Sequence, residues 1–137
     1  MTKEDLNNKH TFKRYERLKN KKTIASLFTK GSYFVCNPLI VRYSFEKTEE
    51  KSCVKAAFVV PKKKFKKAVD RNKIKRKITA AFRQNKYQIY QHFSSEKFIL
   101  NILFIYNTNV ALPYESIENA VKKFNAHLFK KTNFNTN

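Results

Sequence analysis

The spacing of apolar residues along the chain predicts three helices, the first of which is short. Ile24, Leu27 and Phe28 recur at the spacing of one helical face. They predict an amphipathic helix over residues 18–30. Gly31, the only glycine in the chain, follows at a position where many helices end in a left-handed residue. We therefore expect this helix to end at Gly31 in that conformation.

Three stretches rich in branched and aromatic residues predict strands. The first two span about 39–45 and 54–60, and the charged residues 46–52 between them suit a turn. The third, 98–106, is almost uninterruptedly apolar. Such a run is typical of a strand that is covered on both faces.

A long helix is predicted between the second and third strands, because residues 68–93 contain neither glycine nor proline. One face of its helical wheel carries four apolar residues, which are Ile74, Ile78, Ala81 and Phe82. A different side carries Asn72, Arg76, Thr79 and Arg83, with Lys75 at its edge. The wheel therefore predicts one buried face and an exposed ridge that is polar and basic.

A last helix is expected from Pro113, since proline is favoured in the first turn of a helix. Its apolar stripe consists of Ile117, Val121, Phe124 and Leu128. The order helix, strand, strand, helix, strand, helix predicts an α/β (α+β) two-layer sandwich, with helices packed on a small sheet. We expect a single domain over 17–130, preceded by a flexible basic arm over 1–16 and followed by a polar tail over 131–137.

Positive charge dominates the composition and is unevenly distributed along the chain. Thirty Lys and Arg face ten Asp and Glu, which gives a formal net charge of +20. Residues 62–77 alone hold ten basic side chains, whereas residues 98–121 hold none. A charge of this size favours a polyanionic partner, and nucleic acid is the first expectation. There is no apolar run of membrane-spanning length and no signal peptide, so we expect no membrane association and a cytoplasmic location.

Cysteine, histidine and the few carboxylates do not form a recognisable catalytic or metal-binding pattern. Cys36 and Cys53 lack the paired spacing of a zinc site, and we expect them to be reduced and buried. His10, His92 and His127 are equally scattered. The sequence therefore predicts no catalytic residue and no metal ligand in the protein itself.

The basic segment after the second strand carries a specific motif. Residues 59–83 read VVPKKKFKKAVDRNKIKRKITAAFR, and a pattern RNxxKR opens the long helix after a basic loop. The pattern is formed by Arg71, Asn72, Lys75 and Arg76. The preceding order also agrees, with RLKN at 17–20 and LFTKG at 27–31, then two strands and the motif. In this order and spacing, residues 14–130 resemble the bacterial ribonuclease P protein family.

The resemblance implies an endoribonuclease whose chemistry is performed by a large catalytic RNA. Mg²⁺ would be held mainly by that RNA, and no organic cofactor is expected. The protein would bind the catalytic RNA and the 5′ leader of precursor tRNA, and no obligate protein partner is evident. The resemblance also implies that the long helix lies in a left-handed crossover between parallel strands, although about 98% of such crossovers are right-handed.

Matched position by position, the resemblance implies two groups of RNA-binding residues. The catalytic RNA would contact Lys62, Lys63, Arg71, Asn72, Lys73, Lys75 and Arg76. The leader would lie in a cleft between the first helix and the sheet, where Phe28 is the matching aromatic residue. Ile24 occupies a neighbouring position that is aromatic in some members, so one stacking platform is missing. The strand position falls at Arg42 or Tyr43, and a shift of one residue would turn the opposite side chain to the RNA.

Each of these assignments has a plainer alternative. An aromatic residue such as Phe28 on an amphipathic helix is often part of the core. The lysines of 62–67 suit a solvated surface equally well when they are considered alone. Asn72 is compatible with a tolerated polar position within a helix.

The chain also departs from the family pattern at three places. Pro61 stands where the family usually has Ser, the loop KKKFKK lacks the usual Gly, and Thr79 replaces a common Arg. We expect an altered loop conformation and one RNA contact that is lost or moved.

Two other classes of protein share the basic composition. One is a structural RNA-binding protein, such as a ribosomal component or an assembly factor, and the order of motifs argues against it. The other is a DNA-binding module with its basic helix in the major groove. Such a module usually pairs two short helices across a tight turn, whereas here a strand and a basic loop precede the helix.

Overall fold

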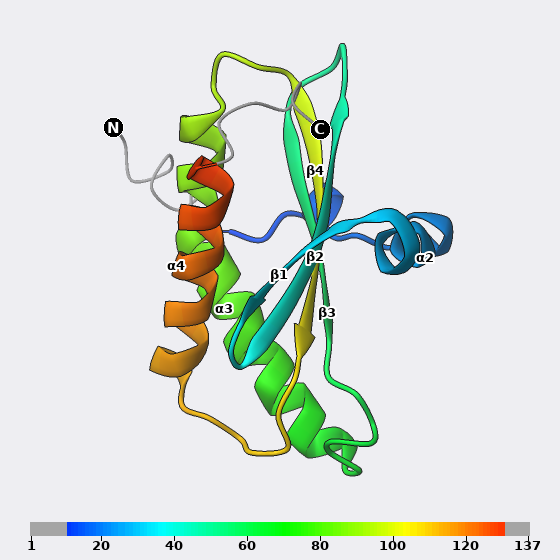
Figure 1. Ribbon diagram of the computed structural model, residues 1–137, viewed down its shortest axis with the longest axis vertical. Helices are drawn as coiled ribbons and strands as arrows, with labels where there is room; N and C mark the ends of the chain where they lie inside the picture. Colours follow the sequence, from blue (N-terminus) through cyan, green and yellow to red (C-terminus); the bar gives the residue numbers. More distant parts are fainter. Residues whose placement is uncertain (1–10, 131–137) are drawn as a thin grey trace.

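The computed structural model of the protein describes residues 11–130 (Figure 1). Its elements are η1 Arg14–Glu16, α2 Lys21–Lys30, β1 Ser32–Cys36, β2 Leu39–Lys47, β3 Cys53–Val59, α3 Ala68–His92, β4 Phe98–Tyr106 and α4 Tyr114–Lys130. All the predicted helices and strands occur in the predicted order, which confirms the α/β sandwich. One strand, β1, was not predicted from the sequence.

The four strands form one sheet in the order β1-β2-β4-β3. β2 is antiparallel to both β1 and β4, whereas β3 is parallel to β4. Because two parallel neighbours cannot be joined by a hairpin, α3 provides the crossover between them. This connection places the start of α3 directly after the basic loop that follows β3.

The helices cover the two faces of the sheet unequally. α3 and α4 lie side by side on one face, and the shorter α2 lies on the other (Figure 1). On β4, Phe104 belongs to the core beneath α3 and α4, while Leu103 packs with Leu18 and Leu27 on the α2 side. The central strand is therefore covered on both faces, as its apolar sequence predicted.

The predicted apolar faces of both long helices are confirmed. In α3, Ile74, Ile78, Ala81 and Phe82 are all buried. In α4, the same holds for Ile117, Val121, Phe124 and Leu128. Because these faces pack against the sheet, the other sides of α3 can make contacts with a partner.

The helix α2 ends at Lys30 as predicted, but its start and the conformation of Gly31 after it differ from the prediction. The helix begins at Lys21 rather than at residue 18, because the Asn20 side chain accepts hydrogen bonds from the backbone N–H groups of Lys22 and Thr23. Gly31 is extended, with φ −68° and ψ 150°, so the expected left-handed conformation is wrong. Glycine is needed there for space, since a Cβ at Gly31 would lie 2.6 Å from the carbonyl oxygen of Leu27.

Part of the expected flexible arm is packed against the domain. Phe12 makes edge-to-face contacts with Phe58 and Phe82, at ring-centroid distances of 5.7 and 5.5 Å. The backbone N–H of Leu18 donates to Ala56 at 2.9 Å, which covers the outer edge of β3. The rest of the expected arm, residues 1–10, and the expected tail, residues 131–137, lie outside the described residues.

Candidate RNA interface

An open groove runs along the side of α3 that faces away from the core. It is lined by Asn72, Lys75, Arg76, Thr79 and Arg83. These are the five residues that the helical wheel predicted as a polar and basic ridge. The exposed residue Lys73 lies on the same helix but does not line the groove.

The loop 61–67 is held onto the start of α3 by hydrogen bonds and one aromatic contact. The carbonyl oxygen of Pro61 accepts from the backbone N–H groups of Lys64 and Phe65, at 3.0 and 3.2 Å. The Phe65 ring packs against Tyr106 on β4, with centroids 5.9 Å apart. The loop therefore turns tightly after the proline that replaces the usual Ser, and it leaves Lys62 and Lys63 exposed.

Arg71 takes part in fixing this loop. Its Nη1 donates to the carbonyl oxygens of Phe65 and Lys66, both at 2.8 Å. Charge-assisted hydrogen bonds of this kind are stronger than neutral ones. The structure therefore gives Arg71 a positioning role that the sequence pattern did not reveal.

The other basic residues of the motif have no acidic partner within residues 11–130. The ion pairs described in this part of the chain join Lys86 to Glu16 and Lys122 to Glu118. None involves Lys73, Lys75 or Arg76. Their charges are available to a polyanion, because a partner carboxylate would otherwise compete with phosphate.

On the opposite face of the sheet, Arg42 lies between β2 and α2. Its Nη1 donates to the carbonyl oxygen of Leu27 at 3.5 Å, and its guanidinium carbon lies 5.8 Å from the centre of the Phe28 ring. The Phe28 side chain remains 47% exposed. Phe28 therefore does not belong to the buried core, which was the plainer alternative considered for it.

Tyr43 points to the other face of the sheet, and its placement in the cleft is wrong. It is 3% exposed, contacts Phe124 edge-to-face, and has its hydroxyl 3.0 Å from Nε2 of His127. Successive residues of a strand alternate between faces, so Tyr43 and Arg42 cannot share one. The register that the sequence left open is thus resolved in favour of Arg42.

Comparisons with known proteins agree with the motif and with the fold. The sequence model of the family "Ribonuclease P" matches residues 12–131 of the chain. The chain belongs to the ribonuclease P protein family. It is 29% identical over 108 residues to the ribonuclease P protein components of two strains of Porphyromonas gingivalis, a match that covers 79% of each chain.

Solved structures of RNase P proteins share the fold. The protein from Staphylococcus aureus superposes with a TM-score of 0.60 at 21% identity, covering 86% of this chain and 98% of the other. The protein from Thermotoga maritima superposes with a TM-score of 0.59 at 21% identity. This superposition covers 80% of this chain and 94% of the other. The mixed α/β architecture described above is therefore that of the RNase P protein.

Family membership also assigns the general function. The chain is the protein component of an endoribonuclease that is a ribonucleoprotein, and it functions in tRNA 5′ processing. Catalysis in RNase P depends on RNA and is assisted by metal ions. The family assignment decides against both the ribosomal and the DNA-binding alternatives.

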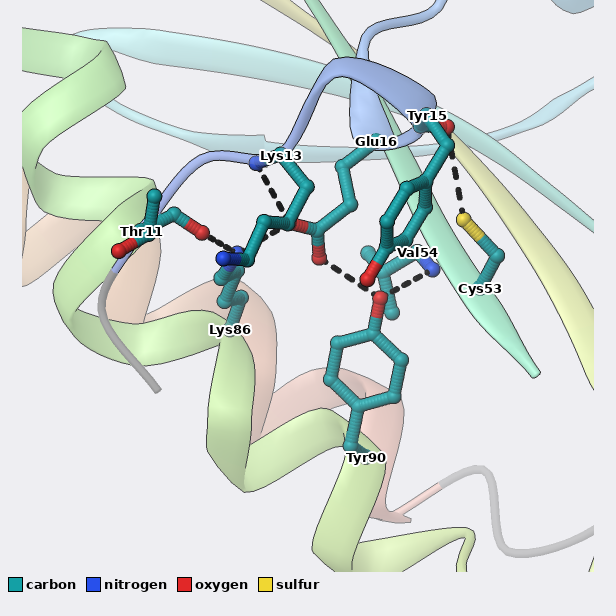
Figure 2. A network of polar contacts seen from close by, with 8 residues as sticks. All are labelled: Thr11, Lys13, Tyr15, Glu16, Cys53, Val54, Lys86 and Tyr90. Atoms are coloured by element: carbon teal, nitrogen blue, oxygen red, sulfur yellow. Dashed lines mark hydrogen bonds and ion pairs between the residues drawn. The ribbon is translucent and has the colours of Figure 1, made fainter. Parts of the chain in front are cut away.

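In this RNase P protein, a buried ionic network anchors the segment before α2 to α3 (Figure 2). The Glu16 carboxylate pairs with the Lys86 ammonium, and the two side chains are 2% and 3% exposed. Glu16 also accepts from the backbone N–H of Lys13 at 2.9 Å and from the Tyr90 hydroxyl at 2.7 Å. Sequence analysis missed this network because Glu16 was assigned to the arm, and no local pattern links residues 70 positions apart.

Burial and the mutual contacts shift the pKa values of this network. Burial lowers the pKa of the Lys86 ammonium, and its hydrogen bond with Glu16 opposes that shift. Burial raises the pKa of the Tyr90 hydroxyl, which also accepts a hydrogen bond from the backbone N–H of Val54 at 2.9 Å. The network therefore joins η1, β3 and the second half of α3, and it fixes the helix on which the groove lies.

The two cysteines lie in the interior of the domain. Cys36 and Cys53 are buried free thiols, and burial raises the pKa of Cys36 to about 12. Between residues 11 and 130, no three His, Cys, Asp or Glu side chains are grouped so that they could hold a metal ion. None of the helices in that range combines the length and the apolar character that a membrane crossing requires.

Proposed function

We propose that the protein binds the catalytic RNA of RNase P through the groove of α3 and the loop before it. The binding residues are Lys62, Lys63, Asn72, Lys73, Lys75 and Arg76, and Arg71 sets the position of the loop. The observation that carries this proposal is the groove itself, in which Asn72, Lys75 and Arg76 line one surface. Basic side chains contribute salt-dependent phosphate contacts, and Asn adds a neutral hydrogen-bonding group.

The 5′ leader of precursor tRNA is the second ligand in this proposal. Its site is the surface between α2 and the sheet, where the exposed Phe28 ring lies near the half-buried Arg42 side chain. Single-stranded RNA offers unstacked bases and phosphates to such a pair. The two RNA ligands thus lie on opposite sides of the sheet, which lets the protein hold both at once.

The catalytic metal belongs to the RNA in this proposal. Mg²⁺ prefers phosphate oxygens, carboxylates and water, and the groove is lined by basic and neutral side chains. The protein promotes leader removal by positioning the substrate and by neutralising phosphate repulsion between the two RNAs. We place this function in the cytoplasm.

The test is cleavage of precursor tRNA by a bacterial RNase P RNA at low Mg²⁺ concentration, with and without the protein. We expect cleavage at the mature 5′ end to require both components. The double variant Lys75→Ala/Arg76→Ala should lower this stimulation. The matched control is Lys122→Ala/Lys123→Ala, which removes the same charge from exposed positions of α4. Equal losses in both double variants would show that only net charge matters and would refute the assignment of the groove.

A further inference from the structure

The face of the sheet next to α2 presents a second exposed aromatic ring. Tyr33 on β1 is 63% exposed, more than Phe28, and Val35 two residues further along is 51% exposed. Tyr33 and Val35 point to the same face because they are two positions apart on one strand. Exposed large apolar side chains scattered singly need no explanation, but here they adjoin the proposed leader site.

The Tyr33 and Phe28 rings both lie near the Arg42 guanidinium. The guanidinium carbon of Arg42 is 5.5 Å from the Tyr33 ring centre and 5.8 Å from the Phe28 ring centre. Tyr33 is also the direct neighbour of Arg42 across the β1–β2 ladder. The two rings and the guanidinium therefore lie close together on the same face of the sheet.

The backbone around Gly31 explains why these rings come together. Gly31 is close to the Leu27 carbonyl group, so the chain passes directly from the end of α2 into β1. Phe28 on the last turns of the helix and Tyr33 on the strand are consequently brought to the same side of the sheet. A larger residue at position 31 would meet the helix backbone and change this geometry.

We propose that Tyr33 is a second base-stacking platform of the leader site and extends that site onto the edge strand β1. This inference rests on the leader site proposed above. An unpaired leader base stacks on the Tyr33 ring, while the nearby Arg42 contacts the adjoining phosphate or base face.

The experiment measures binding of precursor tRNA and mature tRNA to the holoenzyme, assembled from the full-length protein and the catalytic RNA. Tyr33→Ala and Tyr33→Leu should each raise the Kd for precursor tRNA at least about fivefold, as expected for one lost stacked base. Both should leave the Kd for mature tRNA unchanged. Tyr33→Phe keeps the ring and should stay within about twofold of the wild type.

Several results would overturn the proposal. If Tyr33→Leu binds precursor tRNA as well as the wild type, apolar contact is sufficient and no base stacks on the ring. Equal loss for precursor and mature tRNA would place the effect outside the leader. If Phe28→Ala weakens precursor binding while Tyr33→Ala does not, the leader site is supported and its extension onto β1 is refuted. No effect from either variant would reject the leader site as a whole.

A spectroscopic readout separates stacking from an indirect structural effect. Single 2-aminopurine bases are placed at successive leader positions, and their fluorescence is followed when precursor tRNA binds the holoenzyme. We expect one position whose quenching on binding is lost in Tyr33→Leu and retained in Tyr33→Phe. Quenching that is the same in both variants at every position would contradict stacking on Tyr33.

Discussion

The two halves of α3 use positive charge in opposite ways. In the first half, Lys75 and Arg76 line an open groove and have no carboxylate partner among residues 11–130. In the second half, Lys86 is buried and paired with Glu16. A buried charge needs its partner for the fold to persist, whereas a charge without a protein partner is available to a ligand. One helix therefore combines a half that stabilises the fold and a half that we propose to bind RNA.

The largest effect is expected where the buried pair is broken. Lys86→Met should lower the free energy of unfolding by about 3–5 kcal/mol, because the Glu16 carboxylate would remain buried without its counter-charge. The double variant Glu16→Gln/Lys86→Met should lose less than Lys86→Met alone. Urea unfolding followed by circular dichroism measures both.

The chain offers a matched control for this prediction. Lys122 pairs with Glu118 at 3.7 Å on the surface, with Lys122 57% exposed. Lys122→Met should change the free energy of unfolding by less than about 1 kcal/mol. Equal losses in Lys122→Met and Lys86→Met would remove the distinction between the two kinds of charge.

Alkaline pH should weaken the same network through Tyr90. Burial raises the pKa of the Tyr90 hydroxyl above its usual value of 10.0, so the unfolded chain releases this proton at lower pH than the folded chain. Stability contributed by Tyr90 is therefore present below pH about 10 and declines above it, at up to about 1.4 kcal/mol per pH unit. The stability difference between the wild type and Tyr90→Phe should shrink from pH 9 to pH 11 in urea unfolding. A constant difference over that range would contradict the raised pKa.

Arg71 belongs to the half of α3 that we propose to bind RNA, but its charge has a structural role. Its hydrogen bonds hold the loop 61–67 in place. Arg71→Lys keeps the charge but replaces the guanidinium, whose Nη1 donates to both carbonyl oxygens, by an ammonium of different reach and geometry. We expect a loss of about 1–2 kcal/mol in stability. Trypsin should then cut the loop 61–67 faster than in the wild type. The salt dependence of RNA binding should not change, since the charge remains. In Arg71→Gln, which removes the charge, a flatter salt dependence would instead assign Arg71 to direct phosphate contact.

The smallest effect on the fold is expected in the groove. Lys75→Ala and Arg76→Ala should each change the free energy of unfolding by no more than about 0.5 kcal/mol. Each should reduce the slope of log K against log salt concentration, for binding to the catalytic RNA, by about one counterion. Binding titrations at several salt concentrations measure these slopes. Unchanged slopes in both variants would separate the groove from the RNA.

The sequence predicted best where one periodic pattern extended over many residues. In α3, the 3.6-residue period identified the buried face and all five residues of the groove. Periodicity does not show which face of a strand is turned to which helix. The sequence therefore could not decide whether Arg42 or Tyr43 faces α2. β1 was missed because Tyr33 and Val35 are exposed and give the strand no clear burial pattern.

The ionic network was beyond sequence reasoning for a different reason. Glu16 and Lys86 are separated by 70 positions, and each is unremarkable among its neighbours in the chain. Their burial results from the packing of η1 between β3 and α3, which only the assembled fold defines. Long-range polar contacts of this kind carry no local signature.

The anchoring of residues 11–18 bears on the order in which the chain acquires its structure during synthesis. This segment leaves the ribosome before its partners, which are Ala56 on β3 and Lys86 and Tyr90 on α3. Those residues are translated later, so the beginning of the domain must wait until α3 has emerged before it can dock. Until then, the outer edge of β3 lacks its cover. Docking of this segment therefore coincides with the appearance of the helix that carries the proposed RNA-binding groove.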